Sequence, residues 1–241
     1  MYSTFYITHQ KIERRLWVYL PGDYAITEKR YPVLYMQDGQ NLFDFKTSFS
    51  GEWGIDEYLD SCPTAGIVIG IDNGGEKRLL EYNPNDSAEY GKGMGGQYLE
   101  LVVTVLKPYV DKHFRTLPGV EHTAIAGSSM GGLISFYAGL FYPDVFGSVG
   151  VFSPSFWLVP NLEEQVKATA KPADHANQRY YFYAGGRETE GLMTRTVGIS
   201  AIVQKKFRCE VQVQLNEKGT HSEASWKKMF PAFYNWLKGD G

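Results

Sequence analysis

Ser129 is the residue of this sequence that is best placed to act as a nucleophile. It stands at the centre of a G-x-S-x-G motif, Gly127-Ser128-Ser129-Met130-Gly131. A nucleophilic serine sits on a sharp, strained turn, and glycines lack the Cβ atoms that would collide with the chain entering and leaving it. The motif therefore indicates nucleophilic chemistry at the Ser129 hydroxyl, although the same five-residue pattern also recurs by chance in glycine- and serine-rich loops.

The segments on either side of Ser129 favour the nucleophile over the loop. Residues 122–126 form a short apolar, β-prone run, and residues 133–142 carry apolar side chains at helical spacing. A strand, a tight turn and a helix around G-x-S-x-G make up a nucleophile elbow, which exposes the serine oxygen at the top of a sheet. The sequence therefore predicts Ser129 as a catalytic nucleophile.

A serine hydroxyl needs a neighbouring base to take its proton, and chain order selects that base. In hydrolases built around this elbow, an acid and then a histidine follow the serine. Three of the five histidines precede Ser129: His9, His113 and His122. His175 lies in the polar stretch 171–177, which we expect to be a solvated loop. His221, between the last predicted strand and helix, is the predicted base, and a structural position beside Ser222 is the alternative.

The acid that orients the base is expected on the loop after a predicted strand at 179–184, where Glu188 and Glu190 both lie. Glu188 comes first and should still be near the edge of the sheet. Glu190 has a structural explanation, because a carboxylate in the first turn of the next helix interacts favourably with the helix dipole. We predict Glu188 as the acid and keep Glu190 as the alternative.

Two backbone N–H groups are needed where charge develops on a substrate carbonyl. One should belong to Met130, the residue after the nucleophile at the start of the elbow helix. The other should come from residues 38–41, which follow a predicted strand at 31–37. We predict the Gln40 amide, because Gly39 lets the backbone turn there. An ordinary Asp-Gly turn is the alternative interpretation of this loop.

Four residues are candidates for contact with a substrate. The aromatic residues Trp53, Phe156 and Trp157 follow elements near the expected site and could wall an acyl or aryl pocket, or else pack in the core. Arg78 lies in a long glycine-rich loop, 76–96, and could bind a carboxylate or phenolate, or else pair with Glu81 in solvent.

These residues need a scaffold, and the pattern along the chain predicts an alternation of strands and helices. Strands are expected at 5–12, 14–20, 31–37, 66–71, 122–126, 146–152, 179–184 and 208–215. Helices are expected at 56–59, 98–114, 133–142, 160–171, 192–207 and 222–237, with Pro108 ending or kinking the second. This alternation predicts a single α/β domain over residues 1–241, with a mainly parallel sheet and helices on both faces.

Bulk properties exclude several classes of function. A net charge of −3 without any block of like charge argues against a nucleic-acid surface. No apolar run approaches the roughly 20 residues that cross a bilayer, and no signal peptide is visible at the start. Cys62 and Cys209 have no histidine or second cysteine nearby to make a metal site. We therefore expect a cytoplasmic protein with reduced thiols and no cofactor, membrane or nucleic-acid partner.

The sequence resembles the "putative esterase" family of α/β-hydrolases, which includes esterase D-like enzymes and enterochelin, feruloyl and acetylxylan esterases. Four segments carry the resemblance: residues 36–44 (MQDGQNLFD), 127–132 (GSSMGG), 152–157 (FSPSFW) and 221–226 (HSEASW). It implies an α/β-hydrolase fold and the same roles for Ser129, Glu188 and His221, with the Gln40 and Met130 amides as oxyanion donors. Two positions depart from the pattern: Asp38 replaces the histidine of many relatives, and the acid is glutamate where many have aspartate.

The predicted function is a serine carboxylesterase acting on a small-molecule or carbohydrate-linked ester through an acyl-enzyme. A siderophore trilactone esterase is the alternative enzyme, and a non-enzymatic binding protein on a hydrolase fold is the alternative of another class. The intact serine, histidine and glycine set favours an enzyme. The sequence leaves a homodimer open.

Overall fold

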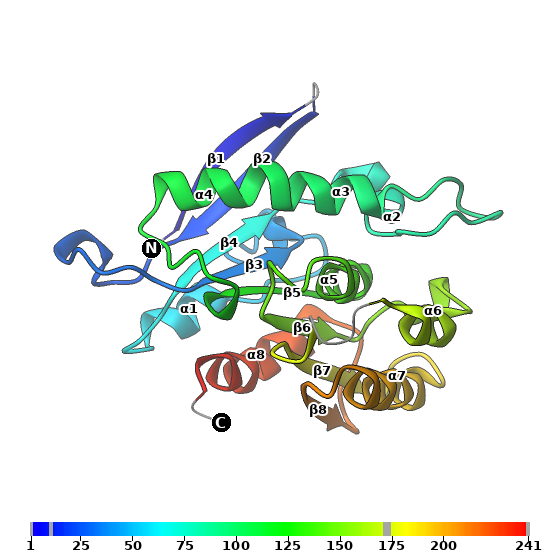
Figure 1. Cartoon of the computed structure of the whole chain (residues 1–241). Helices are drawn as coiled ribbons and strands as arrows, with labels where there is room; N and C mark the ends of the chain where they lie inside the picture. Colours follow the sequence, from blue (N-terminus) through cyan, green and yellow to red (C-terminus); the bar gives the residue numbers. More distant parts are fainter. Residues whose placement is uncertain (1, 10–11, 171–174, 240–241) are drawn as a thin grey trace.

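A computed structural model describes residues 2–9, 12–170 and 175–239 and is organised around one eight-stranded sheet (Figure 1). The strand order is β1-β2-β4-β3-β5-β6-β7-β8. The strands are β1 (Tyr2–His9), β2 (Ile12–Tyr19), β3 (Val33–Gln37), β4 (Ile67–Ile71), β5 (Thr123–Ser128), β6 (Ser148–Phe152), β7 (Arg179–Gly185) and β8 (Glu210–Asn216). Six neighbouring strands, from β4 to β8, run parallel, while β1 and β2 add antiparallel pairings at one edge. The predicted mainly parallel sheet is confirmed.

Helices cover both faces of this sheet, as predicted (Figure 1). They are α1 (Ile55–Asp60), α2 (Arg78–Glu81), α3 (Gly95–Leu101), α4 (Lys107–His113), α5 (Met130–Phe141), α6 (Leu162–Ala168), α7 (Leu192–Phe207) and α8 (Glu223–Lys238). Helices α3 to α7 pack into one core, and α1 and α8 into the other. Successive strand residues point to opposite faces, so Tyr180 and Phe182 of β7 enter the first core while Tyr181 and Tyr183 enter the second.

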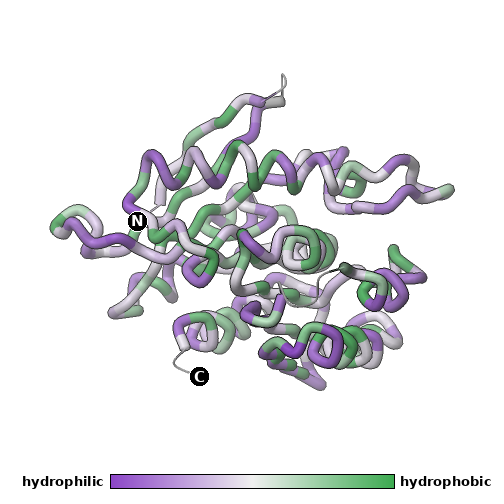
Figure 2. Tube along the Cα trace, viewed as in Figure 1, coloured by the Kyte–Doolittle hydropathy of each residue, from purple (hydrophilic) through white to green (hydrophobic). Residues whose placement is uncertain are grey.

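Helix α5 is buried along almost its whole length, from Met130 to Leu140. Figure 2 shows it as predominantly apolar, in contrast to the mixed colours of the outer helices. A helix that is apolar all round has to lie inside the protein, and α5 accordingly packs against β5 and β6. The helix that follows Ser129 is therefore held firmly by the core.

Pro108 does not end its helix, which was one of the two predicted outcomes. Helices α3 and α4 continue through a π-helical stretch, Val102–Leu106, and Figure 1 shows them as one long helix. The N–H of Lys107 donates to the carbonyl of Val102, five residues back rather than four. This wider turn accommodates the ring of Pro108 and the absence of its backbone N–H at the start of α4.

The long segment 76–96 is more ordered than the predicted loop. It contains the short helix α2, Arg78–Glu81, and a β-bridge between Ser87 and Gly91. Among the helices of the part of the chain described by the structure, none is both long enough and apolar enough to cross a membrane.

Candidate active site

Ser129 occupies a strained turn between β5 and α5, as the elbow motif predicts. Its φ is 58° and its ψ is −121°, a conformation that a residue with a Cβ rarely adopts. The turn is held by backbone hydrogen bonds, from Ser129 N to the carbonyl of Phe152 at 2.9 Å and from Leu133 N to the carbonyl of Ser129 at 3.0 Å. The serine therefore stands fixed at the carboxyl end of a central strand.

We expect Gly127→Ala to lower the free energy of unfolding by about 1–3 kcal/mol, because its Cβ has no room. That atom would lie 2.7 Å from the carbonyl carbon and oxygen of Gly131 and 2.8 Å from Cγ of Gln37. Gly198→Ala in α7 is the matched control, since its Cβ meets nothing within 4 Å and alanine favours a helix. Denaturant unfolding of the two variants checks this, and equal stabilities would contradict it.

A chain of two hydrogen bonds joins Ser129 to His221 and Glu188. The Ser129 Oγ lies 2.9 Å from Nε2 of His221, and Nδ1 of the same ring lies 2.7 Å from Oε2 of Glu188. These residues follow β5, β8 and β7, whose carboxyl ends meet at one edge of the parallel sheet. The His221 side chain is 42% exposed, whereas the Glu188 side chain is fully buried. An imidazole nitrogen is thus within reach of the serine proton, with a carboxylate behind the ring.

The carboxylate of Glu188 is fixed on its far side. Its Oε1 accepts hydrogen bonds from the Ser153 hydroxyl and from the backbone N–H of Gly185, both at 2.7 Å. Ser153 in turn accepts a hydrogen bond from the indole N–H of Trp226 at 2.9 Å. The Trp226 ring also packs edge-on against His221, with ring centroids 5.2 Å apart. Residues in β7 and α8 and directly after β6 therefore hold the Glu188 and His221 side chains in one orientation.

Glu190 does not take part in this arrangement. It lies in the exposed turn before α7, outside the helix that would have explained it as a first-turn residue. His175 is also placed differently from the expectation of a solvated loop. It is buried, its Nδ1 lies 2.7 Å from Oε1 of Gln178, and its ring stacks on Phe207. The polar residues around His175 in the sequence gave no indication that its side chain is buried.

The two predicted oxyanion donors lie in the segments that follow β5 and β3. Met130 is the first residue of α5, and Gln40 lies in a short 3₁₀ turn, Gly39–Asn41, directly after β3. Gly39 lets this turn approach β4, because a Cβ there would lie 2.7 Å from the carbonyl carbon of Gly70. The role of the two amides stays a prediction.

An open cleft of about 850 Å³ lies above Ser129 and His221. Its other walls are mostly polar: Arg15, Asp38, Gln40, Asn41, Thr47, Ser48, Phe49, Ser50, Asp72, Asn73, Gly75, Arg78, Ser128, Glu223 and Trp226. Sequence reasoning missed Glu223, a 7% exposed residue whose Oε1 lies 3.5 Å from Nδ2 of Asn41. Burial raises the pKa of its carboxyl. The only sequence signal for it was its place in the segment HSEASW.

Arg78 lines this cleft but does not pair with Glu81. Its guanidinium makes two hydrogen bonds to Asp38, whereas Glu81 forms a buried ion pair with Arg14 at 2.6 Å. Burial alone would lower the pKa of Arg78, but the hydrogen bonds and the charge of Asp38 outweigh it and raise the pKa above its usual value. The guanidinium therefore remains charged beside the site.

The structure does not bring the three aromatic candidates into the cleft. Trp53 is buried against Phe152 and Trp226, and Phe156 is buried against Phe136. Trp157 is 54% exposed and packs edge-on against Tyr90, and it does not line the cleft. Trp53 and Phe156 therefore pack in the core, which was the alternative interpretation of these residues.

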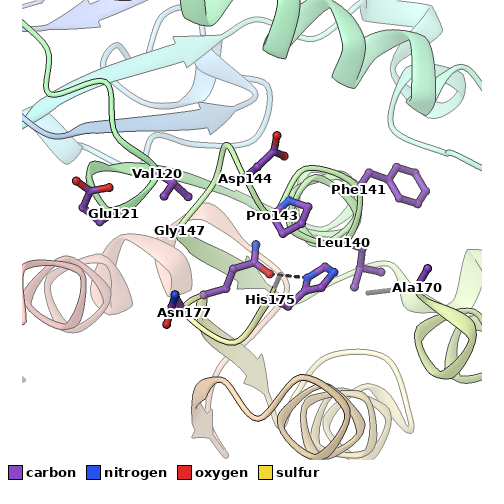
Figure 3. Close-up of a pocket in the computed structure, with 11 residues that line it drawn as sticks. Val120, Glu121, Leu140, Phe141, Pro143, Asp144, Gly147, Ala170, His175 and Asn177 are labelled. Carbon is purple, nitrogen blue, oxygen red and sulfur yellow. Dashed lines mark hydrogen bonds between the residues drawn. The ribbon is translucent and has the colours of Figure 1, made fainter. Parts of the chain in front are cut away.

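A second hollow, of about 590 Å³, lies at the amino ends of the parallel strands (Figure 3). Its walls include Val120, Gly147 and Gln178, which precede β5, β6 and β7. The dashed line in Figure 3 marks the hydrogen bond between the His175 ring and the side chain of Gln178. The hollow is therefore separate from Ser129, which stands at the carboxyl end of the strands.

Metal binding has no support in the described residues. Within them, no group of three or more histidine, cysteine, aspartate or glutamate side chains is placed to hold a metal ion. Cys62 and Cys209 are both free thiols, and burial raises the pKa of Cys209 to about 11.

Two solved structures share the fold along the whole chain. An IroE-like serine hydrolase from Shewanella oneidensis superposes with a TM-score of 0.80 and 19% identity, covering 99% of this chain and 80% of that one. A ferulic acid esterase superposes with a TM-score of 0.75 and 20% identity, covering 100% and 99%. The fold is thus that of these two proteins.

Sequence comparison gives relatives of differing length. YbbA, an uncharacterized protein of Bacillus subtilis, is 29% identical over 96% of this chain and 95% of its own. An endo-1,4-beta-xylanase/feruloyl esterase of Xylanibacter ruminicola is 26% identical over 88% of this chain but 27% of its own. An iron(III) enterobactin esterase of Escherichia coli is 30% identical over 61% of this chain and 34% of its own. The chain therefore matches about a third or less of the last two proteins.

A family model matches almost the whole chain. The model described as "Putative esterase" covers residues 8–237. This range includes all strands and helices from β2 to β8, the elbow, Glu188 and His221. With this match over almost its whole length, the chain belongs to that esterase family.

Proposed function

We propose that this protein is a serine carboxylesterase that works through an acyl-enzyme on Ser129. The observation that carries the proposal is the hydrogen-bonded chain from Glu188 through His221 to Ser129. These three residues lie far apart in sequence, and a serine, a histidine and a carboxylate in this order are the groups that activate a hydroxyl for acyl transfer.

In the proposed mechanism, Nε2 of His221 takes the proton of the Ser129 hydroxyl as its oxygen attacks the ester carbonyl. The same nitrogen then gives this proton to the leaving alcohol, which leaves the acyl group on Ser129. Water, deprotonated by His221, attacks the acyl-enzyme, and His221 gives that proton to Oγ of Ser129 as the carboxylic acid is released. Glu188 holds the ring so that Nδ1 keeps its proton and stabilises the imidazolium that forms. The amides of Met130 and Gln40 stabilise the oxyanion in both steps.

A fluorophosphonate probe tests this proposal. It should label the wild-type protein, because an activated serine attacks the phosphorus atom, and it should not label Ser129→Ala. Ser155→Ala is the matched control, since the Ser155 hydroxyl lies only 3.2 Å from Oγ of Ser129 but has no hydrogen bond to His221. Labelling that persists in Ser129→Ala, or that disappears only in Ser155→Ala, would overturn the assignment of the nucleophile.

A siderophore trilactone esterase is the second candidate. The similarity to an iron(III) enterobactin esterase favours it. Hydrolysis of a catecholate trilactone far faster than of p-nitrophenyl acetate would support this narrower function, and comparable rates would support a general carboxylesterase.

A further inference from the structure

Asp38 has an unusual backbone conformation two residues before the proposed oxyanion donor Gln40. Its φ is 55° and its ψ is 50°, in the left-handed region where L-residues other than asparagine and aspartate are rare. It follows the last residue of β3 and begins the turn of Gly39–Asn41. The conformation at Asp38 therefore sets the direction in which the Gln40 amide leaves the sheet.

Both oxygens of the buried Asp38 carboxylate are held by side chains from the segment after β4. Arg78 donates from Nε to Oδ1 at 2.7 Å and from Nη2 to Oδ2 at 2.8 Å, and Asn73 donates from Nδ2 to Oδ1 at 2.6 Å. A planar guanidinium with two parallel bonds fixes the plane of a carboxylate as well as its position. The side chain of Asp38 is therefore fully oriented.

The same segment also holds the backbone around Asp38. The N–H of Asp38 donates to the hydroxyl of Tyr82 at 3.2 Å, and the Arg78 guanidinium lies 5.2 Å from the centre of the Tyr82 ring. On the other side of Asp38, the N–H of Asn73 donates to the side-chain Oε1 of Gln40 at 3.3 Å. Contacts from residues 73–82 thus reach the turn both before and after Gly39.

Asp38 also touches the elbow. A Cβ at Gly131, in the first turn of α5, would lie 3.0 Å from Oδ2 of Asp38. The carboxylate of Asp38 therefore lies beside the helix start that carries Met130, while its backbone begins the turn that carries Gln40. The two proposed oxyanion donors share it as a neighbour.

We propose that Arg78, Asn73 and Tyr82 form a clamp that holds Asp38 in its left-handed conformation and so positions the Gln40 amide for the oxyanion. This inference rests on the proposed function. The three are positioning residues, and the clamp gives the Arg78–Asp38 pair a role different from substrate binding. A substrate-binding arginine would affect KM for anionic esters, whereas a clamp affects kcat for every ester.

The first test is Arg78→Met, assayed with a neutral and an anionic ester. Loss of the clamp should lower kcat by about 10²-fold, because a small misplacement of a catalytic group has an effect of that size. KM should change little, and equally for both esters. Arg179→Met is the matched control: Arg179 is 28% exposed and ion-paired to Glu210, as Arg78 is 29% exposed and ion-paired to Asp38. Arg179 is the first residue of β7, at the end of the strands opposite to Ser129.

Tyr82→Phe is the second test, because Tyr82 is fully buried and cannot contact a substrate. Removing the one hydroxyl that accepts from Asp38 N should lower kcat by about tenfold. Tyr35→Phe in β3 is its control: that tyrosine is equally buried, and the described residues offer its hydroxyl no hydrogen-bond partner. Thermal unfolding of both variants separates an effect on kcat from a loss of folded protein.

Asp38→Gly in the Arg78→Met background is the third test. Glycine adopts the left-handed conformation without a clamp and removes the carboxylate that Arg78→Met leaves unpaired, so the double variant should recover most of the lost kcat. The clamp would be overturned if the Arg78 and Tyr82 variants had the same kcat as their controls. It would also be overturned if Arg78→Met changed only the KM for the anionic ester. A wild-type protein without esterase activity or probe labelling would instead overturn the proposed function itself.

Discussion

Replacing His221 by alanine is expected to lower kcat for a simple ester such as p-nitrophenyl acetate by about 10⁶-fold. The Ser129 hydroxyl lies 2.9 Å from Nε2 of His221, and its hydrogen bond to that nitrogen is the proposed route by which the serine proton leaves. Without it the hydroxyl stays protonated and is a weak nucleophile. The expected loss is close to that of Ser129→Ala, because the two residues act as a unit and their effects do not add.

Steady-state kinetics on purified variants measure this effect. His113→Ala is the control, since His113 is an exposed histidine at the end of α4, with its Nδ1 2.7 Å from the carbonyl oxygen of Tyr109. A His221→Ala protein that is as active as His113→Ala would contradict the proposed base. The double variant Ser129→Ala, His221→Ala should be no slower than either single variant.

Replacing Glu188 by glutamine is expected to lower kcat by about 10⁴-fold, although the side chain keeps its size. Oε1 of Glu188 accepts two hydrogen bonds, from Ser153 and from Gly185 N, so the glutamine oxygen should take that position. Its NH₂ group would then face Nδ1 of His221, 2.7 Å from the present Oε2. Nδ1 would have to accept a hydrogen bond, the ring proton would move to Nε2, and Nε2 could no longer take a proton from Ser129.

Glu190→Gln is the matched control for this prediction. It makes the same chemical change two residues away, on a side chain that is exposed and has no contact with His221. Its kcat should equal that of the wild type, and the folded stability of both variants should be compared by thermal unfolding. Equal losses in Glu188→Gln and Glu190→Gln would show that neither glutamate orients the base.

The sequence by itself determined the alternation of strands and helices and the place of Ser129. Both depend on local patterns: apolar runs bounded by turn residues for the strands, and glycines on either side of a serine for the elbow. His221 followed from chain order, since His175 was the only other histidine after Ser129. These features are encoded within a few residues or in their order, so no knowledge of packing was needed to predict them.

Only the tertiary structure decided which glutamate lies beside His221. Glu188 and Glu190 are two residues apart on one loop, and the choice between them comes from Ser153 and Gly185, which hold Glu188 at the sheet edge. The aromatic candidates failed for a related reason. A tryptophan or phenylalanine suits a core and a pocket wall equally well, so its type alone cannot say which one it occupies.

Long-range pairing was equally inaccessible to sequence reasoning. Arg78 was expected to bind a substrate anion or to pair with Glu81, three residues away, but its partner is Asp38, forty residues back in the chain. Glu223 lines the cleft, although sequence reasoning did not single it out, and a π-helical turn accommodates Pro108. Each outcome depends on which elements the fold places side by side. Local residue types do not specify that arrangement, because the free energy that selects it comes from packing across the whole sheet.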